Sequence, residues 1–175
     1  MDEKTILALD LAARTGWAFG KVGARSPISG SIRFAKPGAS LGMVFSTCRV
    51  WLRDLVLLHQ PNVVVFESPM TPAHMSGKTN ATTIRLLVGL TAIAEEACFG
   101  LDCREAKVIE VRRHFIGANP KREQAKALTI AACRRLGWAP VDDNAADALA
   151  LWHYQASVFE PLLSLQTHPL FRRQS

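Results

Sequence analysis

The chain has 175 residues, of which 49% are hydrophobic, so it fits one domain with a sizeable core. Its 21% of charged residues is ordinary for a soluble globular protein and excludes the disordered and fibrous classes. The formal net charge is +6, and the longest apolar runs, such as residues 63–66, are far shorter than the roughly 20 residues that a membrane-spanning helix needs.

The excess positive charge lies in one segment of the chain. Residues 104–135 hold nine Lys and Arg residues against three Glu, whereas the rest of the chain holds twelve bases and twelve acids. A segment that carries the whole net charge predicts a face that binds a polyanion. The alternative interpretation is a solvated basic helix surface.

The cysteines and the start of the chain indicate a compartment. The four cysteines, Cys48, Cys98, Cys103 and Cys133, form no CxxC pair and have no nearby histidine at zinc spacing. Residues 1–4 are acidic and do not look like the start of a secretory signal. We therefore expect a cytosolic protein with reduced thiols.

The first part of the chain predicts three strands, a helix and a fourth strand. The three strands cover residues 4–10, 15–22 and 28–35, and glycine and proline residues interrupt the second and third as in a meander. Apolar residues then follow helical spacing over residues 41–59. A proline precedes the run 62–67, which is apolar on both sides and typical of a central strand.

The remainder predicts a loop, a fifth strand and three helices. Residues 68–80 are polar, small and contain prolines, which indicates a loop. A helix is predicted over 81–98, a weaker strand near 101–106 and a helix over 120–136. Residues 142–144 offer an N-cap for a last helix that ends near residue 158.

This order of elements predicts an α/β fold, in which a mixed sheet carries helices on both faces. We expect one domain over residues 1–158, followed by a C-terminal tail over 159–175. The tail contains two prolines and shows no periodicity.

Three acidic residues occupy informative positions. Asp10 and Glu67 end predicted strands, and Asp147 lies one turn into the last helix, with Asp143 and Asn144 four and three residues before it. Clustered carboxylates repel one another unless cations bind between them, and hard oxygen ligands select magnesium or manganese. Taken one at a time, these acids also have ordinary explanations as a turn residue, a helix cap or a surface acid.

Three segments carry a resemblance to a known family. They are residues 6–18 (ILALDLAARTGWA), 63–67 (VVVFE) and 142–150 (DDNAADALA), and they resemble the three acidic motifs of the RuvC family. These proteins are Holliday junction resolvases of the RNase H-like superfamily, and this sequence looks closest to the phage-type members. The match extends over about residues 4–155 and implies an RNase H-like fold with a five-stranded mixed sheet.

The resemblance also implies an activity and a partner. It implies a homodimer that binds four-way DNA junctions and does not associate with membranes. Each protomer would nick one strand and leave a 5′-phosphate, with Mg²⁺ or Mn²⁺ as the cofactor and two ions per active site. The expected location is the cytoplasm of a bacterial cell or a phage-infected host.

Family roles can be assigned to individual residues. Asp10, Glu67 and Asp147 would be the catalytic metal ligands, and the fourth ligand would be Asn144 or the neighbouring Asp143. Met70, or Pro69 beside it, occupies the position of an aromatic wedge residue. The expected DNA contacts are Arg112, Arg113, Lys121, Arg122, Lys126, Met70 and Lys78.

Three other functions stay open from the sequence. The first is a nuclease for other branched or flapped DNA, and the second is a junction-binding relative that has lost catalysis. The third is an actin-like or sugar-kinase ATP-binding domain, whose first strand also ends in an aspartate. That class needs two lobes around the nucleotide, and 175 residues supply only one.

Overall fold

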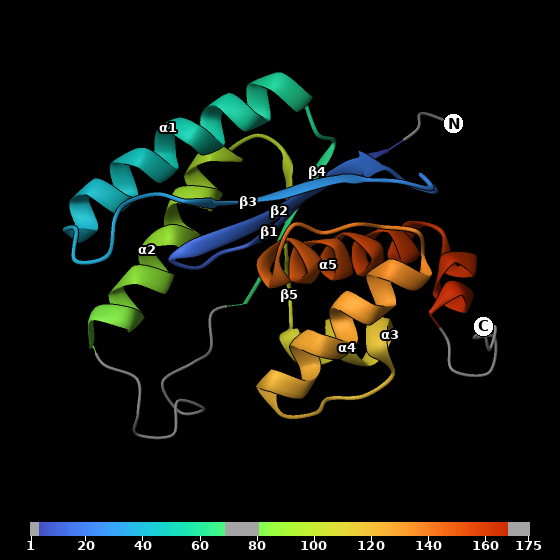
Figure 1. Ribbon diagram of the computed structural model, residues 1–175. Helices are drawn as coiled ribbons and strands as arrows, with labels where there is room; N and C mark the ends of the chain where they lie inside the picture. Colours follow the sequence, from blue (N-terminus) through green and yellow to red (C-terminus); the bar gives the residue numbers. More distant parts are fainter. Residues whose placement is uncertain (1–3, 69–80, 168–175) are drawn as a thin grey trace.

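The structure is a computed structural model that describes residues 4–68 and 81–167 (Figure 1). Its strands are β1 (Thr5–Asp10), β2 (Arg14–Lys21), β3 (Ile28–Arg33), β4 (Val63–Glu67) and β5 (Asp102–Ala106). Its helices are α1 (Leu41–His59), α2 (Ala81–Ala97), α3 (Val108–Ile116), α4 (Arg122–Arg135), α5 (Asp143–Phe159) and the 3-10 helix η2 (Pro161–Gln166).

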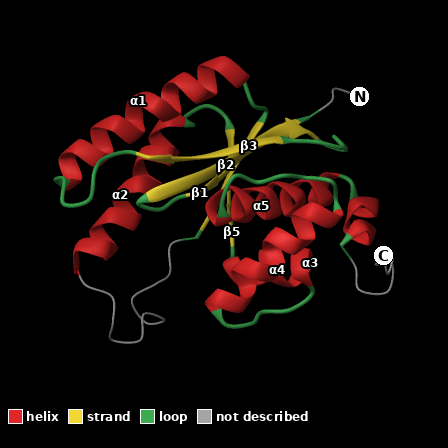
Figure 2. Cartoon of the chain, viewed as in Figure 1, coloured by secondary structure: helices red, strands yellow, loops and turns green. Residues whose placement is uncertain are grey.

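The five strands form one mixed sheet in the order β3-β2-β1-β4-β5 (Figure 2). β1 pairs antiparallel with β2, and β2 pairs antiparallel with β3, as a meander requires. β4 and β5 continue the sheet parallel to β1 on its other side. The predicted α/β fold with a five-stranded mixed sheet is confirmed.

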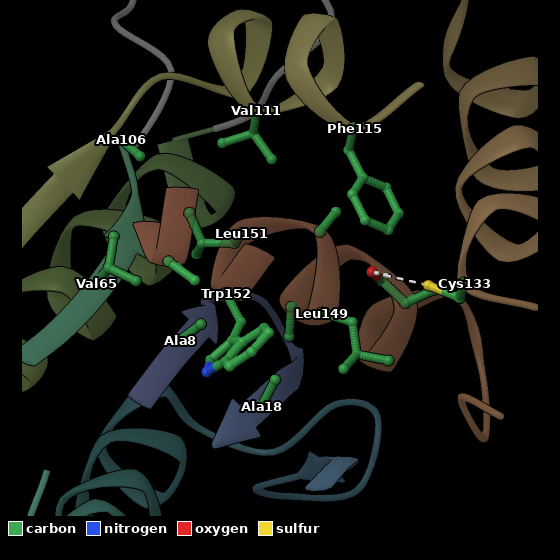
Figure 3. Close-up of a cluster of buried hydrophobic side chains, with 14 of the residues drawn as sticks. Ala8, Ala18, Val65, Ala106, Val111, Phe115, Cys133, Leu149, Leu151 and Trp152 are labelled. Carbon is green, nitrogen blue, oxygen red and sulfur yellow. Dashed lines mark hydrogen bonds between the residues drawn. The ribbon is translucent and has the colours of Figure 1, made fainter. Parts of the chain in front are cut away.

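Helices cover both faces of the sheet (Figure 1). On one face α1 and α2 bury a cluster that includes Leu7 and Leu9 of β1. On the other face α5 lies against the sheet with α3 and α4 outside it, and this cluster includes Ala8 of β1 and Val65 of β4. Figure 3 shows this second cluster, with Trp152 of α5 directed toward the strands.

α5 is the central helix of the fold. Ten of its residues are buried, and five of these are alanines, whose small side chains let neighbouring elements approach closely. The sheet lies on one side of α5, and α3, α4 and η2 contact it on its other sides. His114 of α3 and His153 of α5 form a hydrogen bond of 2.8 Å between their rings, and Gln166 of η2 lies 3.4 Å from the other nitrogen of His153.

Two elements differ from the sequence-based expectation. The basic stretch before residue 120 forms α3, where no helix was predicted, because nine residues with two arginines and a histidine give only a short apolar pattern. Part of the predicted tail forms η2, which packs Leu163 into the core. In the described part of the chain no helix has the length and apolar character needed to cross a membrane.

Candidate active site

The two strand-end acids are neighbours in the sheet and face the same helix. The parallel register of β1 and β4 runs to one residue before each strand end, so Asp10 and Glu67 follow side by side. Side chains alternate between the faces of a strand, so Asp10 lies on the face of Ala8 and Glu67 on the face of Val65. Both of those core residues pack toward α5, and the two carboxylates therefore face α5 as well.

Asp147 approaches the same place from one turn into α5. The start of α5 comes very close to β2, because a Cβ atom at Gly16 would lie 1.9 Å from the backbone oxygen of Asn144. Gly16 is also the antiparallel partner of Asp10. The absence of a side chain at Gly16 thus lets the start of α5 rest on the sheet beside Asp10.

Polar contacts hold the start of α5 in this position. Asp142 is its N-cap and accepts a hydrogen bond of 2.9 Å from the backbone N–H of Ala145. The other carboxylate oxygen of Asp142 accepts a hydrogen bond of 2.5 Å from the Ser31 hydroxyl on β3 and lies 3.4 Å from the guanidinium of Arg14 on β2. One capping residue therefore ties α5 to two strands of the sheet.

The acids line a cleft of about 400 Å³ together with basic side chains. The sheet and α5 supply its acidic wall, α3 and α4 supply its basic residues, and α2 adds Leu87 and Thr91. The predicted site residues that the structure brings together here are Asp10, Glu67, Asp143, Asn144, Asp147, Arg112, Arg122 and Lys126.

Burial and neighbouring carboxylates raise the pKa of each of the three predicted metal-binding carboxylates. Burial raises the pKa of Asp10 well above its usual range, and the charges of Glu67 and Asp147 raise it further. The pKa of Glu67 rises to about 7, by burial first and then by Asp147. That of Asp147 rises to about 6, chiefly by burial. The cleft thus concentrates negative charge that needs protons or cations for compensation.

The basic side chains of the cleft oppose this effect in part. Arg112 of α3 lowers the pKa of both Glu67 and Asp147, which means that it stabilises their ionised forms. Arg122 at the start of α4 lowers the pKa of Asp10 in the same way. A phosphodiester entering the cleft would meet these cations next to the carboxylates.

Asp143 and Asn144 have different environments within the cleft. Lys126 of α4 places its Nζ 2.5 Å from Oδ2 of Asp143. This hydrogen bond is the main cause that lowers the pKa of Asp143, so Asp143 is an ionised partner of the lysine. Asn144 donates from Nδ2 to Asp143 at 3.4 Å, which leaves the amide oxygen as the Asn144 atom with ligand character.

The other predicted DNA-binding residues lie elsewhere. Arg113 on α3 and Lys121 at the start of α4 are exposed and do not line the cleft. Met70 and Lys78 lie outside the described residues. Sequence reasoning missed Thr91 and the structural role of Gly16. A glycine inside a predicted strand is a signal of close backbone approach, and that signal was present for Gly16.

The chemistry of the acidic wall fits a hard divalent cation. Carboxylate oxygens from three elements meet at one cleft, and such oxygens are the ligands that magnesium and manganese prefer. Within residues 4–68 and 81–167, no three His, Cys, Asp or Glu side chains lie close enough together to form a metal-binding group. The oxygen donors are thus of the right chemical type for a hard cation, and they are spread over the walls of an open cleft.

Comparison with known proteins relates this architecture to solved structures. Neither a protein-family model nor a curated protein matches the sequence. Among solved structures, Thermus thermophilus RuvC matches with a TM-score of 0.64 and 15% identity, over 90% of this chain and 96% of that one. The same protein in complex with a Holliday junction substrate matches with a TM-score of 0.64 and 13% identity over the same shares.

A mitochondrial protein shares the same architecture. The yeast mitochondrial Holliday junction resolvase Ydc2 matches with a TM-score of 0.62 and 9% identity, over 92% of this chain and 83% of that one. At these identities the likeness establishes the fold, and it extends over nearly the whole of each chain. The chain therefore has a RuvC-like fold, as the three acidic segments predict.

Proposed function

We propose that this protein is a metal-dependent endonuclease that resolves four-way DNA junctions. The observation that carries the proposal is the cleft itself, which four carboxylates and three cationic side chains line within a RuvC-like fold. Phosphodiester hydrolysis can be catalysed by carboxylates that hold divalent cations, next to Arg and Lys side chains that bind phosphate. The likeness to structures described as RuvC and as a Holliday junction resolvase supports the choice of substrate.

In this proposal Asp10, Glu67 and Asp147 hold two Mg²⁺ or Mn²⁺ ions. Bound there, the ions would activate a water molecule and stabilise the leaving oxygen. The raised pKa values of the three carboxylates are a reason for cations to bind, because each cation removes the repulsion that burial intensifies.

We assign the fourth ligand position to Asn144. Asp143 is already paired with Lys126, so using it as a ligand would require that ion pair to break. The amide oxygen of Asn144 supplies a neutral donor without that cost. Asp143 then holds the ammonium group of Lys126 in place, and this group would bind a DNA phosphate.

The basic residues divide into two groups by position. Arg112, Arg122 and Lys126 line the cleft and would hold the scissile phosphate beside the carboxylates. Arg113 and Lys121 are exposed next to them and would contact the DNA backbone further away. The proposal includes a homodimer that makes paired symmetric nicks and leaves 5′-phosphates, acting in the cytoplasm of a bacterial or phage-infected cell.

The test is cleavage of a synthetic four-way junction, with duplex, flap and single-stranded DNA of matching sequence as comparison substrates. Reactions contain Mg²⁺, Mn²⁺ or EDTA. Asp10→Asn is the inactive variant, and Asp54→Asn is its matched control, because it makes the same change at an exposed position of α1. We expect paired nicks at the junction for the wild type and Asp54→Asn, and no nicks for Asp10→Asn or with EDTA.

Other outcomes would change the proposal in defined ways. Equal cutting of flaps and junctions would assign the protein to general processing of branched DNA. Tight junction binding without cleavage in either metal would identify a relative that binds but does not cut. Cleavage by Asp10→Asn at the wild-type rate would show that the active site lies elsewhere.

A further inference from the structure

Two cysteines come together at the far end of the sheet from the cleft. Cys98 follows the last residue of α2, and the backbone N–H of Leu101 donates to its carbonyl at 2.9 Å, which closes a tight turn through Gly100. The chain then enters β5 (Figure 1), and the second residue of this strand is Cys103. The turn thus folds the start of β5 back against the end of α2.

The register of the sheet directs Cys103 toward Cys98. Cys103 is the parallel partner of Val64, whose side chain packs in the cluster under α1 and α2. Because paired residues on neighbouring strands point to the same face, Cys103 lies on the face that α2 covers. The Cys98 thiol is buried in that same cluster, and its interaction with Cys103 raises the pKa of Cys98 and lowers that of Cys103.

One thiol of this pair is accessible and the other is protected. Cys103 is exposed, whereas Cys98 is only 1% exposed. Both line a surface pocket of about 370 Å³ that also includes Gly100 and Arg104. A small thiol reagent can therefore reach Cys103, and the buried Cys98 lines the same pocket.

We propose that Cys98 and Cys103 form a reversible intramolecular disulfide, which makes this pair a site of oxidation by low-molecular-weight disulfides such as oxidised glutathione. The pair lies at the amino-terminal end of β5, whereas the cleft lies at the carboxyl-terminal ends of β1 and β4. The inference is therefore independent of the proposed nuclease activity.

The acidity of the thiols assigns their order of reaction. The interaction with Cys98 lowers the pKa of Cys103, although burial and the neighbouring Glu95 and Asp102 act against it. Burial raises the pKa of Cys48 and of Cys133 to about 12. Thiolates are the reactive form, so Cys103 is the first nucleophile and the two core cysteines are inert.

The reaction balances with one molecule of oxidised glutathione. The Cys103 thiolate attacks one sulfur of the glutathione disulfide, forms a mixed disulfide and releases one glutathione thiolate, which takes up a proton. The Cys98 thiol then loses its proton to solvent, and its sulfur attacks the Cys103 sulfur and releases the second glutathione. Two protein thiols are oxidised to a disulfide, and one glutathione disulfide is reduced to two thiols.

The test treats the folded full chain with oxidised glutathione, followed by denaturation, alkylation and mass spectrometry. Of the four thiols, we expect two to remain alkylatable. After the mass of the two added alkyl groups is subtracted, the protein should be two hydrogens lighter than the reduced chain, and a peptide should carry a crosslink between Cys98 and Cys103. Reduced glutathione in excess should restore all four. Cys98→Ser should instead retain glutathione on Cys103, and Cys103→Ser should not react.

Cys103→Ser changes an exposed side chain, so its folding is not at risk, and Cys48 and Cys133 serve as internal references in every sample. The inference is overturned if the wild type keeps glutathione on Cys103 without losing the two hydrogens. It is equally overturned if Cys48 or Cys133 reacts first, or if the only crosslink joins two molecules.

Discussion

Replacing Glu67 by glutamine should stabilise the fold while it abolishes the proposed cleavage. The side chain keeps its shape, one acceptor oxygen becomes an amide NH2 donor, and the charge that burial and Asp147 oppose is lost. A site that stores unfavourable charge for function is expected to gain stability when one charge is removed. The gain should depend on pH, because the wild-type carboxyl can also lose its charge by protonation.

The size of the effect follows from the pKa of Glu67, which rises from 4.5 to about 7 on folding. A raised carboxyl pKa means that the folded state binds the proton more tightly than the unfolded state. The contribution of the protonated Glu67 to the free energy of unfolding is therefore fully present below pH 4.5 and is lost as the pH rises through 7. A shift of this size corresponds to about 3 kcal/mol as an upper limit. Water in the open cleft screens the charge, and we expect roughly half of that limit, or about 3–6 °C in Tm.

The assay is thermal unfolding of the wild type and Glu67→Gln across the pH range. At about pH 8.5 the variant should melt higher, and at about pH 5 the two proteins should melt together. Adding Mg²⁺ at the higher pH should raise the Tm of the wild type more than that of the variant, since a bound cation removes the same repulsion.

Asp54→Asn controls for the loss of one negative charge from an otherwise basic protein, because Asp54 is exposed on α1. Its Tm should follow that of the wild type at every pH. If Glu67→Gln melts at or below the wild type throughout, neither burial nor Asp147 disfavours the charge of Glu67 in the folded state. The electrostatic description of the cleft would then be wrong.

Three further predictions test other parts of the structure. Gly16→Ala places a Cβ atom 1.9 Å from the backbone oxygen of Asn144, so we expect the free energy of unfolding in urea to fall by about 1–3 kcal/mol. Cleavage should also be slower, at unchanged junction affinity. A wild-type unfolding free energy together with a wild-type cleavage rate would refute the close approach. Lys126→Gln should weaken junction binding and lower the slope of log affinity against log salt by about 1. An unchanged slope in a binding titration would exclude a phosphate contact. The pKa values of His114 and His153 fall from 6.5 to about 4, so the unfolded chain binds more protons between these limits, and the histidines destabilise the fold as pH falls through them. His114→Gln should therefore show a shallower loss of unfolding free energy over that range than the wild type, and equal slopes would count against the buried pair.

The sequence predicts those parts of the structure that depend on local pattern. The helix over Leu41–His59 has the predicted bounds, because its apolar spacing is regular and Ser40 caps its start. The strand acids could be placed because each ends an apolar run. α3 was missed because its buried residues, such as Val111 and Phe115, are separated by charged side chains.

Contacts between distant residues could not be predicted in the same way. Gly16 packs against Asn144, which lies more than a hundred residues later in the chain. Nothing in the local sequence pattern indicates which element packs against this glycine. The pairing of Lys126 with Asp143 likewise depends on how α4 packs against α5. That contact distinguishes the roles of two adjacent residues that the sequence alone leaves equivalent.

The burial of α5 has a consequence for which parts of the cleft can move. Asp147 lies on a helix enclosed by the sheet and by its outer helices, so it cannot shift without disturbing the core on both sides. α3 and α4, which supply Arg112, Arg122 and Lys126, contact mainly α5 and each other. If the proposed function is correct, the basic wall would adjust to DNA of different shapes, while the acidic wall would hold a constant position relative to the phosphate.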